Sequence, residues 1–263
     1  MIRKTLPVYD DQFYDEMNEG VLMSAKTVVP AVLNILEPKS VVDVGCGIGT
    51  WLSVFHECGV RTVLGIDGEY INRAKLLIPE TSFMPIDLTM PFTLSKSFEL
   101  AISLEVAEHL PGSSARSFVS SLCRLAPAVL FSAAIPGQGG QHHINEQWPE
   151  YWRRLFAAHD FRMFDALRPS LWYDETVVAC YRQNLFLFFS ETLLESRPAL
   201  RRFPEVKDDR GLMLISPQIA FIQMGLRAAL KRLPRLVWEA LVRRFHSLMT
   251  VRPAMPLLER RHE

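Results

Sequence analysis

The chain has few cysteines, and none of them are spaced as metal-binding or disulfide-forming pairs usually are. No C-x-x-C pair occurs among the four, which are Cys46, Cys58, Cys123 and Cys180. This usage argues against a zinc knuckle or a disulfide framework. Residues 1–16 turn acidic where a signal peptide needs its apolar region, and no apolar run approaches the ~20 residues that span a bilayer. We therefore expect a reduced, cytoplasmic protein.

The chain also lacks net charge, because 29 basic residues balance 29 acidic ones. The charge is unevenly spread: from Arg201 to the end there are 13 Lys and Arg against 6 Asp and Glu, so this part carries +7 and the first 200 residues carry −7. An acidic body with a basic tail argues against an enzyme that binds nucleic acid along a broad basic face. With 49% hydrophobic residues, the 263 residues can bury a sizeable core.

Short β-branched runs alternate with helical patterns along the chain. Strands are predicted at 41–44, 62–67, 82–86, 98–104, 128–135, 161–167 and 185–190. Helices are predicted in a lead-in at 10–36 and between the strands at 50–58, 70–77, 114–125 and 149–159. This alternation indicates βαβ units. The predicted fold class is therefore α/β, with a seven-stranded, mostly parallel, doubly wound sheet.

Three parts of the chain follow from this pattern. We expect an N-terminal helical lead-in or lid at 1–38, a main domain at 39–192 and a basic amphipathic helical extension at 193–263. The stretch 218–249 alternates apolar residues with Arg and Lys at helical spacing. Such helices can fold onto their own domain, lie on an anionic membrane surface as a peripheral contact, or form a homodimer contact.

Three glycines follow the first predicted strand in the stretch VVDVGCGIGT, residues 41–50. In an open parallel sheet, ligands bind beyond the carboxyl ends of the strands. A glycine there lets a ligand approach the backbone, because no Cβ stands in the way. A dinucleotide fingerprint has the spacing G-x-G-x-x-G, whereas this chain has G-x-G-x-G. Asp43 before the glycines either contacts a ligand or holds the turn through backbone N–H bonds.

This stretch resembles motif I of the class I S-adenosylmethionine (SAM) dependent methyltransferases, and the resemblance reaches from about residue 40 to 190. Asp67 ends the second strand, where an acidic residue bonds the ribose hydroxyls, as it also does in dinucleotide enzymes. Asp87 follows the third strand, where the family bonds the adenine amino group. The resemblance implies a Rossmann-like methyltransferase fold whose cofactor-binding residues are Asp43, Gly45, Cys46, Gly47, Gly49, Asp67, Gly68, Asp87, Leu88 and Leu104.

Polar side chains follow the fourth and fifth predicted strands, where loops carry catalytic residues. The stretch SLEVAEHL, residues 103–110, contains Glu105, Glu108 and His109, whose spacing predicts one shared helical face. It resembles the E-x-x-E-H subgroup of O-methyltransferases, of the ubiquinone-biosynthesis and small-RNA 2′-O-methyltransferase types. That resemblance implies a divalent metal, Mg, Mn or Fe, held by Glu105, Glu108, His109 and either His142 or the preferred His143.

The same residues have a second interpretation without a metal. His143 or His142, in the loop IPGQGGQHHINEQW at 135–148, would then be the general base, because the pKa of histidine lies near working pH. The candidate catalytic residues are His143, His142 and Glu105. The predicted function is methyl transfer to a hydroxyl of a small-molecule acceptor: a sugar, a glycolipid or a phenolic secondary metabolite. The alternatives are an N-methyltransferase, a non-catalytic SAM-binding scaffold and an NAD-dependent dehydrogenase.

Overall fold

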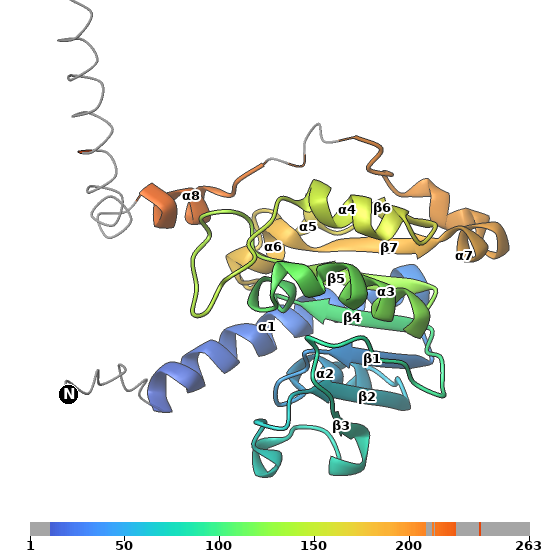
Figure 1. Cartoon of the computed structure of the whole chain (residues 1–263), viewed down its shortest axis with the longest axis horizontal. Coiled ribbons are helices and arrows are strands. Elements are labelled where there is room, and N and C mark those ends of the chain that lie inside the picture. The colour runs from blue at the N-terminus through green and yellow to red at the C-terminus, as the bar shows by residue number, and fades with distance from the viewer. Residues whose placement is uncertain (1–10, 209–211, 213, 225–236, 238–263) are drawn as a thin grey trace, which may run out of the picture. The chain divides into compact units, whose positions relative to one another are not determined.

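The computed structural model describes residues 11–208, 212, 214–224 and 237 (Figure 1). The strands are β1 (Ser40–Val44), β2 (Thr62–Asp67), β3 (Phe83–Pro85), β4 (Leu100–Leu104), β5 (Ala128–Ser132), β6 (Phe161–Phe164) and β7 (Phe186–Ser190). The helices are α1 (Asp11–Leu36), α2 (Thr50–Glu57), α3 (Ala115–Leu125), α4 (Pro149–Ala157), α5 (Arg168–Leu171), α6 (Ala179–Asn184), α7 (Glu191–Ser196) and α8 (Pro217–Met224).

The strands form one sheet in the order β3-β2-β1-β4-β5-β7-β6. The first five of these are parallel, whereas β7 runs antiparallel to both β5 and β6. The predicted α/β class and mostly parallel sheet are therefore confirmed. The strand order reverses between β1 and β4, and ligands bind at such a switch point in doubly wound folds.

Helices cover both faces of the sheet, and alternate residues of β1 point to the two faces. Val41 lies in the hydrophobic core that α1 and α2 cover, and Val42 lies in the core that α3 and α4 cover. Figure 1 shows α3 and α4 in front of the sheet and α1 behind it. Because side chains of a strand alternate in direction, a strand buried on both faces reads as a continuous apolar run.

Helix α1 packs on α2 with one apolar face, whose fully buried residues are Ala25, Val28, Val29 and Val32. Within it, Glu19–Leu36 is long and apolar enough, by length and composition only, to cross a membrane. The sequence-based statement that no apolar run approaches this length is therefore wrong. The buried face belongs to the domain core, which accounts for the apolar composition of the segment.

The predicted helix at 70–77 is wrong, because this segment contains only the 3-10 turn Arg73–Lys75. The Asn72 side chain accepts a hydrogen bond from the Ala74 N–H, which ties the turn locally. The Leu77 N–H donates to the Ile48 carbonyl, 2.8 Å away, so the end of the segment bonds to the loop of glycines after β1 and does not continue as a helix.

After β7 the chain packs back onto the domain. The Val206 N–H donates to the Met163 carbonyl at 2.8 Å, and Leu212, Ser216 and Ile219 are each 2% exposed. Residues 1–219 form one compact unit and 220–263 a second. The predicted parts 1–38, 39–192 and 193–263 stay predictions, and most of the basic stretch 218–249 lies outside the described residues.

Candidate active site

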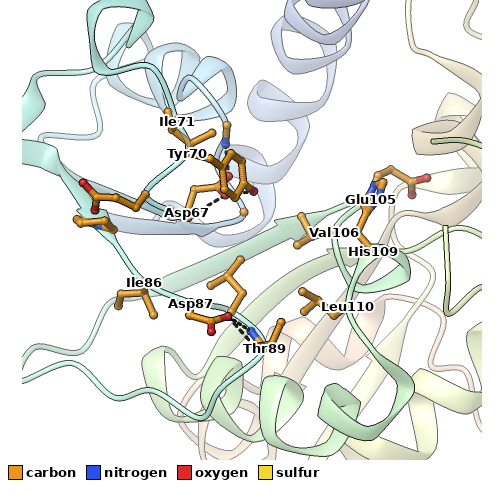
Figure 2. Close-up of a pocket in the computed structure, with 16 residues that line it drawn as sticks. Asp67, Tyr70, Ile71, Ile86, Asp87, Thr89, Glu105, Val106, His109 and Leu110 are labelled. Atoms are coloured by element: carbon orange, nitrogen blue, oxygen red, sulfur yellow. Dashed lines mark hydrogen bonds between the residues drawn. The ribbon is translucent and has the colours of Figure 1, made fainter. Parts of the chain in front are cut away.

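A cavity of about 870 Å³ opens beyond the carboxyl ends of β1, β2, β3 and β4 (Figure 2). It lies at the switch point of the sheet, where a ligand is expected. Among the predicted cofactor-binding residues, those that line it are Gly45, Gly47, Asp67, Gly68, Asp87 and Leu88. The other four, which do not line it, are Asp43, Cys46, Gly49 and Leu104.

The three glycines after β1 have three different surroundings. A Cβ at Gly45 would lie 2.4 Å from Val106, and one at Gly49 would lie 2.9 Å from Ile78, so both are required for close packing. Gly47 has a φ of +54° and no heavy atom within 4 Å of a Cβ position. Only Gly47 therefore fits the expectation that the loop is left open for a ligand.

Asp67 is 4% exposed and organises the loop around it. Its Oδ2 accepts from the Gly47 N–H at 2.7 Å, and its Oδ1 accepts from the Gly68 N–H at 2.7 Å and from the Tyr70 hydroxyl at 2.6 Å. Tyr70, which the sequence analysis does not single out, is 81% exposed. Figure 2 shows the Tyr70 side chain beside Asp67.

The cavity lining is acidic. Its four carboxylates belong to Asp67, Glu69, Asp87 and Glu105, and no Lys or Arg is among the described residues that line it. Thr89 donates to Asp87 Oδ1 through both its N–H and its hydroxyl, and these bonds hold the pKa of Asp87 below its usual value. Such a lining favours a ligand that carries positive charge.

Asp43 at the end of β1 and Cys46 between the first two glycines are both buried. Asp43 is 2% exposed, and burial, followed by the charge of Asp67, raises its pKa well above the usual value. Cys46 packs against β2, since a Cβ at Gly65 would lie 2.7 Å from its Sγ. Neither of these two buried residues lines the cavity.

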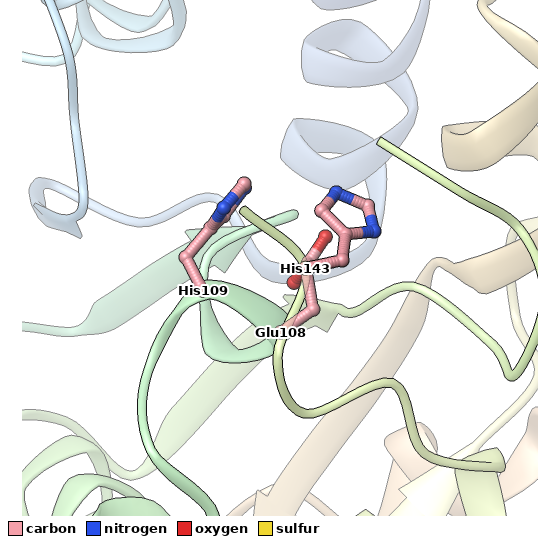
Figure 3. A group of neighbouring side chains, drawn as sticks. All are labelled: Glu108, His109 and His143. Carbon is pink, nitrogen blue, oxygen red and sulfur yellow. The ribbon is translucent and has the colours of Figure 1, made fainter. Parts of the chain in front are cut away.

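A second group of side chains gathers at the end of the cavity where His109 lies. The possible ligand atoms of Glu108, His109 and His143 all lie within 4.8 Å of one another (Figure 3). Glu108 and His109 come from the 3-10 turn after β4, and His143 comes from the loop after β5. The N–H groups of Ile144 and Asn145 both donate to the Glu108 carbonyl and so join the loop to the turn.

Glu108 is fully buried, and neither of its carboxylate oxygens has a hydrogen-bond partner among the described residues. Burial, and then the charge of Glu105, raises the pKa of Glu108 well above its usual range. Partial burial and the nearby His143 ring lower the pKa of His109, which favours its neutral form. A buried carboxylate without a partner is costly, and a bound cation would remove that cost.

Glu105 does not share a helical face with Glu108 and His109, so that prediction is wrong. Its backbone has a φ of +54°, and residues 107–109 form only a single 3-10 turn. Its Oε2 accepts from the Gln138 amide at 2.8 Å, and its Oε1 accepts from the Asn184 amide at 3.2 Å. Glu105 is therefore not one of the grouped side chains, whereas the other three predicted metal ligands are.

The loop that carries His143 is organised by Glu146, which is not among the catalytic residues predicted from the sequence. Glu146 accepts from the N–H groups of Gly137 and Gly139 at 2.7 and 2.9 Å, and its Oε1 lies 3.0 Å from His143 Nδ1. The sequence does contain a signal for Glu146: it is a carboxylate three residues after a histidine, in a loop whose glycines supply several N–H donors. His142 is exposed and stands outside the group.

Residues 19–166 match the model of a family described as a methyltransferase domain. No curated protein sequence matches the chain. Among solved structures, DesVI of Streptomyces venezuelae is 16% identical with a TM-score of 0.54, covering 68% of this chain and 96% of that one. The sugar N-methyltransferase KedS8 from Streptoalloteichus is 17% identical with a TM-score of 0.54, covering 72% and 98%.

Human N-acetylserotonin methyltransferase, solved in complex with SAM, is 15% identical with a TM-score of 0.50 and covers 68% of this chain and 55% of that one. At these identities the likeness concerns the fold. It confirms the Rossmann-like methyltransferase fold expected from the glycine loop.

Proposed function

The chain belongs to the class I SAM-dependent methyltransferases, and from this premise we propose that it transfers a methyl group from SAM to a hydroxyl of a small-molecule acceptor. The acidic cavity supports SAM as the ligand, because the sulfonium of SAM is a cation. A dinucleotide carries an anionic pyrophosphate, which four carboxylates without a lining Lys or Arg disfavour. The NAD-dependent dehydrogenase is therefore the weaker alternative.

The observation that carries the proposal is the group formed by Glu108, His109 and His143, of which His109 lines this cavity. Methyl transfer from a sulfonium is an in-line displacement, so the protein must orient the acceptor and remove its proton. If His143 Nδ1 carries the hydrogen and donates it to Glu146, then Nε2 is left with a lone pair for that proton. In the version without a metal, His143 is accordingly the proposed general base.

The three grouped residues also fit a divalent metal. Two imidazoles and one carboxylate form a donor set for Mn²⁺, Fe²⁺ or Mg²⁺ that leaves positions for acceptor oxygens. The unpartnered oxygens of buried Glu108 support such a site. When bound, the metal would lower the pKa of the acceptor hydroxyl. Glu108, His109 and His143 would hold it, and Glu105 would not.

N-methylation without a metal is the second candidate, because the His143–Glu146 pair provides a base on its own. We also propose a cytoplasmic location, no nucleic-acid partner, and a membrane-surface or homodimer contact through the basic tail. A sugar, a glycolipid or a phenolic metabolite remains the proposed acceptor class.

The test is to incubate the chain with methyl-labelled SAM and an extract of its native host, and to identify the labelled product. We expect an O-methylated product whose formation stops after exhaustive chelation and returns with Mn²⁺ or Mg²⁺. An N-methylated product formed in chelator would contradict the metal-assisted O-methyl version. In the version without a metal, His143→Ala should lower the rate ~10²–10⁴-fold, as for loss of a general base. His142→Ala should change the rate little, and equal effects of the two variants would contradict the assignment of His143.

A further inference from the structure

A chain of buried side-chain amides ends on the carboxylate of Glu105. The Ser216 N–H donates to Gln183 Oε1 at 2.6 Å, and Gln183 Nε2 donates to Asn184 Oδ1 at 3.1 Å. Asn184 Nδ2 then donates to Glu105 Oε1 and, at 2.9 Å, to Gln138 Oε1. Gln138 Nε2 closes the chain by donating to Glu105 Oε2 at 2.8 Å.

The hydrogen bonds of this amide chain run in one direction, from the Ser216 N–H to the carboxylate of Glu105. An ionised carboxylate can accept hydrogen bonds but cannot donate them. The exposed fractions are 1% for Gln183, 3% for Asn184, 2% for Ser216 and 9% for Gln138. Hydrogen bonds to a charged acceptor in a region without water are stronger than those at a surface, and successive bonds polarise one another. The network therefore fixes the place of the Glu105 carboxylate and favours its ionised form against burial, which raises the pKa of Glu105.

The amide chain joins four separate parts of the molecule. Glu105 follows β4, Gln138 belongs to the loop that carries His143, Gln183 and Asn184 end α6, and Ser216 precedes α8. The Glu105 backbone is held as well, since its N–H donates to the Ser132 carbonyl at 3.1 Å and to the Ser132 hydroxyl at 3.0 Å. The charge of Glu105 raises the pKa of Glu108, and the nearby His143 ring lowers the pKa of Glu105.

We propose that Gln138 and Asn184 are positioning residues for the methyl transfer, and that they hold the Glu105 carboxylate as a fixed negative charge beside Glu108, His109 and His143. This inference rests on the proposed function. A fixed negative charge stabilises the positive charge that gathers at these side chains, whether it comes from a metal ion or from the proton of the acceptor. Through Gln183, Ser216 makes the segment 214–219 part of the same support.

The test uses the full chain and two matched variants. Asn184→Asp places a second carboxylate against Glu105 and removes the donor. Glu105→Gln combined with Asn184→Asp restores a hydrogen bond between the two positions but moves the negative charge from residue 105 to residue 184. Asn34→Asp, the same change at an exposed position of α1, is the control. The readouts are the melting temperature, and kcat and KM for methyl-labelled SAM in host extract.

We expect Asn184→Asp to lower both the melting temperature and kcat, the latter by at least about tenfold. The double variant should recover the melting temperature while kcat stays low and KM for SAM changes by less than about threefold. Gln138→Met, which removes the other donor, should lower kcat in the same way and carries the test if Asn184→Asp does not fold.

A double variant that recovers both the melting temperature and kcat would overturn the inference, because the network would then be structural only. Unchanged kcat in Gln138→Met and Asn184→Asp would overturn it too. In either case the proposed function would survive. Absence of methyl transfer by the wild-type chain would contradict the proposed function itself, and the inference with it.

Discussion

At the scale of single residues, Gly47 differs from Gly45 and Gly49 because close packing does not require a glycine there. Its replacement therefore tests the proposed ligand binding. Gly47→Val would place a branched side chain in the open cavity and would strain a backbone at φ +54° by about 1–3 kcal/mol. We expect loss of SAM binding, measured by calorimetry, with the fold kept. Gly59→Val is the matched control, because Gly59 has a φ of +97°, equally open surroundings and no place in the cavity. Equal SAM affinity in the two variants would contradict the assignment of Gly47.

Glu108 should make stability depend on pH. Its pKa is raised in the folded chain, so the folded state keeps a proton that the unfolded state has lost. The contribution of Glu108 to the free energy of unfolding is therefore greatest below its ordinary pKa of 4.5 and falls as the pH rises toward the raised value. In chelator, Glu108→Gln should gain stability relative to wild type between about pH 5 and about pH 8. A pH-independent difference in urea unfolding would contradict this.

The sequence predicts several residues of the candidate site because their chemistry is local. Asp67 and Gly47 follow strands whose ends meet at one edge of the sheet, so their neighbourhood was predictable. The amides of Gln138 and Asn184 were not, because nothing in an isolated Gln or Asn indicates a partner 33 or 79 residues away along the chain. Glu105 was misplaced because helical spacing was applied to a segment that turns with a positive φ.

At the scale of elements, the strand and helix patterns predicted the sheet well, since β2 covers the predicted 62–67 and α3 lies within one residue of the predicted 114–125. The predicted helix at 70–77 failed where a tertiary bond decides the backbone: the Leu77 N–H bonds to Ile48. A sequence pattern predicts a helix or strand when the periodicity of its apolar residues decides the backbone conformation. It fails where a hydrogen bond to a residue distant in sequence decides that conformation.

The loop that carries His143 provides a test at the same scale. A Cβ at Gly140 would lie 2.2 Å from His143 Nε2, so Gly140→Ala must displace the ring, whereas a Cβ at Gly139 has open space. We expect Gly140→Ala to lower methyl transfer about tenfold or more while SAM affinity stays near that of wild type. Gly139→Ala should keep most activity. Equal rates of methyl transfer in the two alanine variants would contradict the proposal that the reaction depends on the position of the His143 ring.

At the scale of the whole molecule, the segment after β7 belongs to the folded unit. A chain ending at residue 208 loses buried Leu212 and Ile219, each worth about 1.5–3 kcal/mol, and the Ser216 bond to Gln183. We expect it to melt well below the full chain, whereas a chain ending at Met224 should melt within a few degrees of it. Equal melting of both truncations, by circular dichroism, would contradict the packing described for this segment.

Binding of SAM in the acidic cavity around Asp67 can be measured by titration calorimetry of SAM and of NAD into the wild-type chain and into Asp67→Ala. We expect one SAM per wild-type chain, no detectable binding of NAD, and at least about tenfold weaker SAM binding in Asp67→Ala, as expected for lost charge-assisted hydrogen bonds. Binding of NAD with similar affinity, or unchanged SAM affinity in Asp67→Ala, would contradict this expectation.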